Sequence, residues 1–296
     1  MISGKLSKTL VLFLLIKQFI CITSYIIAKT YPYSKEDDLN ALKETLEHIR
    51  ILPAIRKICR PESFGEVYGA HKLCSFFENA QFPCYFFSFG IETDYTFDRM
   101  LHNRYNCSGY AFDPTVDYPT DLLPGVKFIK AGANSPVPPT TSTYHSVPKL
   151  RKQLGHPLFA LKMDCEGCEY SLAQDILADD PDFFLSILQF SFELHLPRAF
   201  ANTEEDVYSL GRLFRLLQLS GMRLVHVDDG RCGHDTQRQG CHELLDSIGF
   251  PCEPGCRSYL FAHNYLSAAA WLSTYQRIHG TSTSSGRQQL DHADSG

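Results

Sequence analysis

The chain has 296 residues, of which 44% are hydrophobic and 21% are charged. This composition is that of a folded protein with one large core or two smaller ones, and it excludes a disordered chain outside the C-terminal end. The formal net charge of −5 leaves no basic footprint, so nucleic acid is not an expected partner.

The first feature in chain order is an apolar N-terminal segment. Lys5 and Lys8 precede a mostly apolar stretch from Thr9 to Ala28, which is about as long as a helix that crosses a bilayer, with Lys17 near its middle. Two interpretations stay open for residues 1–30: a signal anchor that tethers the chain to a membrane, or a cleaved signal peptide. Either predicts the secretory pathway, with the protein secreted or held in the Golgi or ER membrane facing the lumen.

Cysteine usage favours the same compartment. The chain has eleven cysteines, a high number for a cytosolic enzyme, and disulfides persist only where the environment is oxidising. A zinc site built from Cys165-x-x-Cys168 and Cys252-x-x-x-Cys256 is the alternative, but neither pair belongs to a recognisable zinc-ribbon or zinc-finger pattern. We therefore predict disulfides, whose connectivity the spacing does not give.

Residues 31–83 are expected to form an N-terminal helical extension. Ser34 is typical of a helix N-cap, and acidic residues follow in the first turn. Leucine and isoleucine then recur on one helical face until Pro53, where the pattern predicts that the helix ends.

Short apolar runs follow from Cys84 onward, and most lack polar alternation, as in strands buried on both faces of a parallel sheet. The seven runs are Cys84–Phe89, Ser108–Phe112, Val126–Ala131, Leu158–Met163, Ile187–Phe192, Arg223–Val227 and Ser258–Ala262. A helix is predicted over 203–219, before Gly221, and a proline-rich loop over 132–148. The whole pattern predicts a doubly wound α/β sheet with helices on both faces, followed by a disordered tail at 280–296.

The turn after the first of these strands is a candidate ligand site. Gly90 allows close approach of the backbone, whereas Glu92 stands where a dinucleotide motif has its second glycine. A carboxylate there repels a pyrophosphate, while Glu92 or Asp94 attracts the ammonium and sulfonium of S-adenosylmethionine. A strand-to-helix turn without a ligand explains the same residues.

Two further strand ends extend this site. Asp113 ends the second strand twenty-three residues after Gly90, close to the spacing at which an acidic residue binds a ribose diol; a turn residue before Pro114 is the alternative. Gly132 ends the third strand, where backbone groups could meet an adenine edge.

The fourth strand runs directly into Leu161-Lys-Met-Asp-Cys-Glu-Gly-Cys-Glu169. Asp164, Glu166 and Glu169 gather there within six residues, and acidic side chains at a strand end are rarely needed for folding. The alternative is a helix N-terminus, whose dipole favours Glu166 and Glu169.

Ser88-Phe-Gly-Ile, Ala111-Phe-Asp-Pro and the Asp164–Glu169 element together resemble the FkbM-type methyltransferases, specifically their animal methyltransferase-like branch. The resemblance covers about residues 60–265. It implies a Rossmann-like sheet of seven strands with the last antiparallel, a methyltransferase domain at 84–266, and O-methylation from S-adenosylmethionine. By position, Gly90 and Asp113 would line the cofactor site, and Asp164 the cleft between cofactor and acceptor. Glu92 departs from the family pattern, which has a small residue there.

The fifth strand ends in Glu193-Leu-His195, and its period of two places Glu193 and His195 on one face beside Asp164. One hypothesis makes His195 the general base for an acceptor hydroxyl, oriented by Glu193. The other makes Asp164, Glu193 and His195 ligands of a divalent cation. A histidine satisfied at a strand end is the structural alternative.

The sequence thus predicts an S-adenosylmethionine-dependent methyltransferase of the secretory pathway, acting on a hydroxyl of a glycan or small molecule. The main rival is a non-catalytic secreted or membrane-tethered protein that keeps the fold, which the altered glycine turn favours. A nucleotide-sugar or dinucleotide enzyme is disfavoured by Glu92.

Overall fold

The computed structural model describes residues 34–55, 60–66, 70–75, 84–133, 143–196, 200–229, 240–251 and 256–263. The predicted targeting segment 1–30 and tail 280–296 lie outside these ranges. Within them, no helix combines the length and apolar character needed to span a bilayer.

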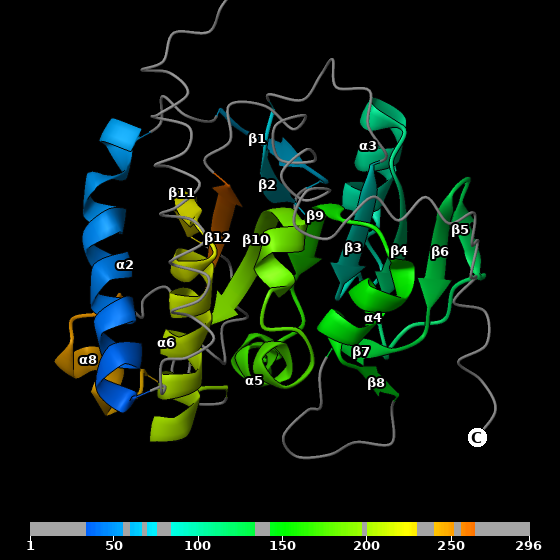
Figure 1. Ribbon diagram of the computed structural model, residues 1–296. Coiled ribbons are helices and arrows are strands. Elements are labelled where there is room, and N and C mark those ends of the chain that lie inside the picture. The colour runs from blue at the N-terminus through cyan, green and yellow to red at the C-terminus, as the bar shows by residue number, and fades with distance from the viewer. Residues whose placement is uncertain are drawn as a thin grey trace, which may run out of the picture.

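The described residues form one large mixed sheet of eight strands (Figure 1). In their order across the sheet the strands are β11 (Met222–Asp229), β12 (Cys256–His263), β10 (Ile187–His195), β9 (Leu158–Met163), β3 (Tyr85–Phe89), β4 (Ser108–Phe112), β6 (Val126–Ile129) and β5 (Asp121–Leu123). All seven predicted strands are present, so the predicted α/β class is confirmed. The sequence missed β5, which is three residues long and only partly buried.

Strand directions follow the predicted pattern. Strands β10, β9, β3, β4 and β6 run parallel to one another, whereas β5 is antiparallel to β6 and the last strand, β12, is antiparallel to both β10 and β11. From β3 the chain first builds outward through β4 and β6, and then returns to place β9 on the other side of β3. The switch point of this doubly wound sheet therefore lies between β3 and β9, where ligands bind beyond the carboxyl ends of the strands.

Helices cover one face of the sheet with the larger part of the core. These are α2 (Lys35–Ile55), α4 (Val147–Leu154), α5 (Glu169–Asp179) and α6 (Glu204–Leu219), which pack on phenylalanine, leucine and methionine side chains of β3, β9 and β10. The short elements η1 (Phe183–Ser186) and α8 (Glu243–Ser247) add Phe183, Phe184 and Leu245 to the same core. Helices α2 and α6 lie side by side at one end of the molecule, opposite β5 (Figure 1).

The other face is covered by α3 (Thr96–Tyr105) and by a small antiparallel sheet of β1 (Pro61–Phe64) and β2 (His71–Cys74). Residues 31–83 therefore contribute two strands as well as the predicted helix. That helix continues to Ile55, two residues beyond Pro53, where the sequence predicted its end. A proline in the last turn removes one backbone donor but leaves the preceding turns intact.

The predicted helix over 203–219 is confirmed as α6, which begins with a capping box between Thr203 and Asp206 and is followed by Gly221. The predicted loop over 132–148 is wrong at both ends. Strands β7 (Gly132–Ala133) and β8 (Tyr144–His145) pair there, and α4 begins at Val147. Pro148 is compatible with α4 because the first turn of a helix has no use for its N–H.

Candidate functional site

The glycine turn after β3 lies directly against the end of β9. Gly90 has φ +73°, and a Cβ at this position would lie 1.6 Å from the backbone oxygen of Asp164. The Asp164 N–H donates to the Phe89 oxygen at 3.1 Å, and the Gly90 N–H donates to the Phe112 oxygen at 2.9 Å. A neighbouring strand, rather than a ligand, therefore explains why glycine is needed here.

Asp113 ties the loops after β3 and β4 together. Its Oδ2 accepts the Glu92 N–H at 2.8 Å, while its Oδ1 accepts the Thr115 N–H at 2.8 Å and the Thr115 hydroxyl at 2.6 Å. Asp113 is thus a turn residue, and it also binds the backbone of Glu92 in the neighbouring loop. Asp94 lies at the start of α3, where its Oδ1 accepts the Thr96 N–H at 2.8 Å.

Carboxylates from three strand ends share one electrostatic environment. Burial raises the pKa of Glu92, and the nearby negative charges of Glu166, Asp164 and Asp113 raise it further. The predicted cluster of Glu92, Asp113 and Asp164 is therefore assembled at the switch point. A cation placed among these groups is stabilised by their charge.

Gly132 does not fit the role expected of it. Its N–H donates to the Thr143 oxygen at 2.9 Å, and a Cβ would lie 2.4 Å from the Tyr144 ring. The close pairing of β7 with β8 accounts for this glycine, and its N–H is not available to an adenine edge.

Asp164, Glu193 and His195 come together as predicted, on the sheet face that β1 and β2 cover. The His195 Nε2 lies 4.0 Å from the Asp164 Oδ1, and the Glu193 and Asp164 carboxyl groups lie close enough to interact. Burial and the charge of Asp164 raise the pKa of Glu193 to about 7. Burial also acts to raise the pKa of Asp164, but His71, Lys162 and His195 outweigh it and hold that pKa below its ordinary value. Of these two adjacent carboxyl groups, Glu193 therefore holds its proton more tightly, and Asp164 is the carboxylate.

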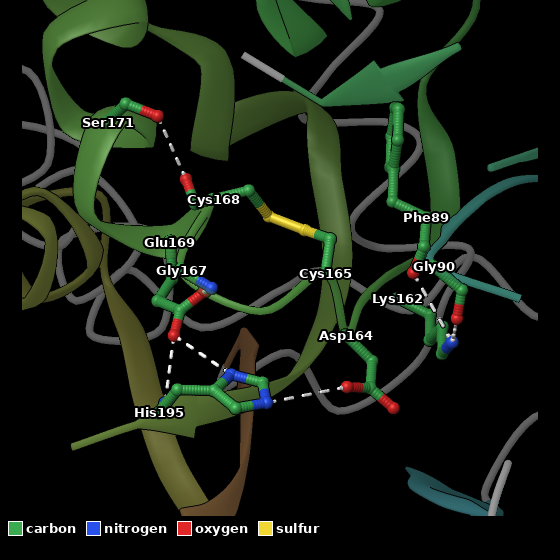
Figure 2. Close-up of a disulfide and its surroundings, with 10 residues drawn as sticks. All are labelled: Phe89, Gly90, Lys162, Asp164, Cys165, Gly167, Cys168, Glu169, Ser171 and His195. Carbon is green, nitrogen blue, oxygen red and sulfur yellow. Dashed lines mark hydrogen bonds and ion pairs between the residues drawn. A yellow bond between two sulfur atoms is a disulfide. The ribbon is translucent and has the colours of Figure 1, made fainter. Parts of the chain in front are cut away.

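Glu169 fixes His195 from the opposite side (Figure 2). Its Oε1 accepts the His195 backbone N–H at 2.8 Å and the ring Nδ1–H at 3.1 Å, and its Oε2 accepts the Gly167 N–H at 3.0 Å. Burial acts to lower the pKa of His195, but Glu169, Asp164 and Glu193 outweigh it and raise the pKa to about 9. The ring is therefore a cation at neutral pH. Glu169 also begins α5, as the alternative of a helix N-terminus expected.

His71 on β2 is a member of the cluster that the sequence did not indicate. Its Nε2 lies 3.6 Å from the Asp164 Oδ2, and its Nδ1 lies 3.1 Å from the Ser191 hydroxyl. Burial lowers the pKa of His71, so the neutral ring donates from Nε2 toward Asp164 and accepts the Ser191 proton at Nδ1. The chain has twelve histidines, and nothing in the local pattern distinguishes this one.

Lys162 supplies a second cation that the sequence did not single out. It is buried in β9, and its Nζ donates to the backbone oxygens of Phe89 and Gly90. Burial raises the pKa of Asp98 to about 7, although the positive charge of Lys162 acts to lower it. The lysine therefore supports the glycine turn and offsets part of the negative charge of the site.

The described residues fit a divalent cation poorly. Glu193, His195 and Cys256 have potential ligand atoms within 4.8 Å of one another. Cys256 is disulfide-bonded and offers no thiolate, and His195 is protonated. The hypothesis of a cation bound by Asp164, Glu193 and His195 requires that the proton be displaced from a ring held between two carboxylates.

Cysteines form disulfides, as predicted. Cys84 pairs with Cys107, and Cys165 pairs with Cys168. Cys74, Cys241 and Cys256 are also disulfide-bonded. The zinc alternative for Cys165-x-x-Cys168 is therefore wrong, because both thiols are consumed.

Comparison with known proteins gives only distant similarities. No protein-family model and no curated protein matches the chain. Among solved structures it is similar to the fibrillarin pre-rRNA processing protein of Methanococcus jannaschii, at 9% identity and a TM-score of 0.36 over 66% of this chain and 71% of that one. It is also similar to the plantazolicin methyltransferase BamL, solved with a triazolic desmethylPZN analog and SAH, at 11% identity and a TM-score of 0.32 over 84% of this chain and 99% of that one. Similarity at this level identifies no family, and the FkbM-type resemblance stays a prediction.

Proposed function

We propose that the chain is an S-adenosylmethionine-dependent methyltransferase whose donor lies across the carboxyl ends of β3, β4 and β9. The observation that carries the proposal is the convergence of Glu92, Asp113 and Asp164, one from each strand end, at the switch point of the sheet. Carboxylates favour the ammonium and sulfonium of this donor and disfavour a pyrophosphate. When bound, the donor supplies an activated methyl group to a nucleophile aligned behind it.

In this proposal Asp113, Glu92 and Asp94 belong to the donor side of the site, and Asp164 lies between donor and acceptor. Asp113 has both carboxylate oxygens engaged by backbone or hydroxyl donors, and Oδ2, which accepts only the Glu92 N–H, retains lone-pair capacity for a further hydroxyl. Lys162 holds the Phe89 and Gly90 carbonyls, which keeps the turn against Asp164.

The acceptor is proposed to be a hydroxyl of a glycan or small molecule, and Glu193 to take its proton. Glu193 with a pKa of about 7 is partly ionised at neutral pH, which suits a general base. His195, with a pKa of about 9, is proposed to balance the charges of Asp164 and Glu169 instead of accepting a proton itself. The secretory address is proposed from the apolar N-terminal segment and from the disulfides, which persist in an oxidising compartment.

A non-catalytic protein with this fold is the second candidate. It is favoured by the hydrogen bonds that groups of the site already form within the protein. The Asp113 carboxylate accepts the N–H groups of Glu92 and Thr115, and the Gly132 N–H donates to the Thr143 oxygen. Such internal hydrogen bonds hold the loops without any ligand.

Calorimetric titration with S-adenosylmethionine distinguishes the two candidates. A donor at about 100 times its Kd stabilises the folded state by about 2.7 kcal/mol, which is a measurable rise in Tm. Asp113→Asn should weaken binding at least about tenfold, because it removes a charge from the donor site. Asp117→Asn, at an exposed residue paired with Lys130, is the matched control and should leave binding unchanged. No heat and no change in Tm up to millimolar donor would favour the non-catalytic protein.

The acceptor requires a separate experiment. A screen of glycans and catechol-like small molecules with isotopically labelled donor measures methyl transfer directly. Label incorporated by the wild type and lost in Glu193→Gln supports the proposed base, whereas equal incorporation by both proteins contradicts it.

A further inference from the structure

A disulfide lies inside the candidate site, in the loop that joins β9 to α5. It links Cys165 and Cys168, whose Cα atoms are 5.6 Å apart, and these cysteines are flanked directly by Asp164 and Glu169 (Figure 2). Both cysteines are partly exposed. Neither the fold nor the proposed methyl transfer requires a covalent bond here, since hydrogen bonds already join Tyr170 to Gly167 and Ser171 to Cys168 at the start of α5.

The loop within this disulfide holds the backbone in an unfavourable conformation. Glu166 has φ +50° and Gly167 has φ +104°. For glutamate, a left-handed conformation costs about 1–2 kcal/mol, and it persists only where the surroundings impose it. Once the ring is opened, Glu166 is free to return to negative φ, which turns the following peptide plane and with it the Gly167 N–H.

Gly167 connects this loop to His195 by two routes. Its N–H donates to the Glu169 carboxylate, whose other oxygen holds both the backbone and the ring of His195. Phe200 packs on the Cα of Gly167, with a ring carbon 3.1 Å from where a Cβ would be, and its ring centroid lies 5.1 Å from that of His195. A change at Gly167 is therefore transmitted to the ring that faces Asp164.

The second described pair, Cys84–Cys107, provides an internal comparison. It joins the starts of β3 and β4 at the opposite edge of the sheet, and Cys107 is completely buried. It closes a segment with a sequence separation of 23, against 3 for Cys165–Cys168. Longer loops gain more stability from a disulfide, and the buried Cys107 sulfur is inaccessible to an attacking thiolate, which confines attack on this pair to the partly exposed Cys84. Cys165–Cys168 is therefore the more reducible of the two.

We propose that Cys165–Cys168 is a redox-active disulfide, reduced by a dithiol, and that its reduction releases Glu169 and His195 and lowers the activity of the site. A thiolate of the dithiol attacks one sulfur and forms a mixed disulfide, and the second thiol of the reductant then displaces the protein thiol. Two electrons and two protons pass to Cys165 and Cys168, and the reductant becomes a disulfide. The activity named here is the proposed methyl transfer, whereas the redox chemistry and its effect on His195 do not depend on it.

The first test measures reducibility in the full chain. The protein is equilibrated with dithiothreitol mixtures of increasing reducing strength, its free thiols are alkylated, and the modified cysteines are identified by mass spectrometry. We expect Cys165 and Cys168 to be alkylated while Cys84 and Cys107 remain paired and the near-UV circular dichroism stays native. Simultaneous reduction of both pairs, or reduction only upon unfolding, overturns the proposal.

The second test measures what reduction does to the site. In the protein reduced only at Cys165 and Cys168, we expect the pKa of His195, followed by NMR of its ring, to fall from about 9 toward the ordinary 6.5. Methyl transfer should fall on the order of 10- to 100-fold, as expected when the groups that position a reacting site are displaced. An unchanged His195 pKa overturns the proposal, even in a protein that transfers no methyl group. Absence of transfer in the oxidised protein contradicts only the proposed function.

A paired variant removes any effect of the reductant itself. Cys165→Ser with Cys168→Ser keeps the side-chain size and should show the reduced behaviour without dithiothreitol. If this variant does not fold, the selectively reduced wild type decides the question through the His195 signal. A folded variant with the wild-type His195 pKa counts against the proposal.

Discussion

At the scale of single residues, the charge of each group in the site is set by its immediate partner. His195 is held as a cation because Glu169 and Asp164 lie on either side of its ring. Asp164 stays ionised between two histidines and Lys162, while Glu193, which lacks such a set of cations, keeps its proton to about pH 7. The titrations of Asp164, Glu169, Glu193 and His195 are therefore linked, and a charge removed from one of them changes the others.

This arrangement predicts a bell-shaped pH dependence of kcat/KM for the proposed methyl transfer. Activity should rise as Glu193 ionises through about pH 7, because its carboxylate accepts the proton. It should fall as His195 loses its proton through about pH 9, because the positive charge between Asp164 and Glu169 is then lost. The acidic limb should disappear in Glu193→Gln, along with most of the activity. A profile that rises steadily through pH 9 would instead support His195 as the base.

Gly90→Ala is predicted to impair both folding and donor binding. The new methyl group would lie 1.6 Å from the Asp164 oxygen, so β3 and β9 must separate where the site is built. Gly155→Ala is the matched control, since Gly155 has nearly the same φ, +71° against +73°, and nothing within 4 Å of its Cβ position. The control should lose only the cost of a left-handed alanine, about 1–2 kcal/mol.

Denaturant unfolding and calorimetric titration with S-adenosylmethionine measure the two effects. Gly90→Ala should lose more unfolding free energy than Gly155→Ala and should bind no donor, whereas the control should bind normally. Equal losses in both variants would show that the contact between Gly90 and Asp164 is not important.

At the scale of elements, the contact between α2 and α6 depends on one glycine within a helix. A Cβ on Gly211 would lie 2.2 Å from the backbone oxygen of Asp38 in α2. Next to it, Arg212 donates to the buried Asp38 carboxylate at 2.9 Å. The two helices can therefore approach closely enough to form this ion pair only without a side chain at position 211.

Gly211→Ala is therefore predicted to destabilise the protein, although the same change inside an uncrowded helix stabilises it by about 0.5–1 kcal/mol. Overpacking of α2 against α6 should cost about 1–3 kcal/mol in unfolding free energy, measured by urea denaturation. The sign of the change in unfolding free energy tests the prediction, because a more stable variant would mean that α2 does not pack closely against Gly211.

The elements also show how far the sequence determines this structure. The buried strands β3, β4, β9 and β10 were predictable because they are covered on both faces and so lack polar alternation. Strand β5 and the β7–β8 pair were not, because two or three residues carry no period. The start of α4 does not show in the sequence because Pro148 favours a loop, whereas in the structure Ser146 caps a helix that has Pro148 in its first turn.

The candidate site divides in the same way. Asp113, Asp164, Glu193 and His195 were predictable because each follows or ends a recognisable strand, and parallel strands bring their carboxyl ends to one edge. His71 and Lys162 were not, because each reaches the site through packing between distant segments. The raised pKa of His195 likewise depends on a contact with Glu169 across twenty-six residues of chain.

At the scale of the whole molecule, the sheet is held by a disulfide and by backbone pairing, neither of which uses the charged side chains of the site. Cys84–Cys107 joins the amino ends of β3 and β4, while the β12 strand is bonded on both edges by β10 and β11. The charged groups of the site lie at the carboxyl ends of the parallel strands. This division lets the site concentrate buried charge at the switch point while the surrounding sheet supplies the stability.

The buried His263 makes the stability of the fold depend on pH. It is buried in β12, its Nε2 lies 2.8 Å from the Phe184 oxygen, and burial lowers its pKa to about 4 from the ordinary 6.5. Above pH 6.5 the ring is neutral in both the folded and the unfolded chain. Between pH 6.5 and 4 only the unfolded chain takes up the proton, so the folded state loses stability as the pH falls, by about 3 kcal/mol in total. Asp98, with its raised pKa, acts in the opposite direction over the same range.

Because His263 and Asp98 oppose each other, the effect of His263 appears in the difference in unfolding free energy between a variant and the wild type. His263→Gln keeps a donor for the Phe184 oxygen but has no proton to gain, so its unfolding free energy, relative to wild type, should rise steadily as the pH falls from 6.5 to 4. His48→Gln, at a partly exposed position on α2, should follow the wild-type curve. Urea unfolding at a series of pH values gives both curves. Parallel curves for His263→Gln and wild type would mean that the buried ring takes up a proton in the folded protein as readily as in the unfolded chain.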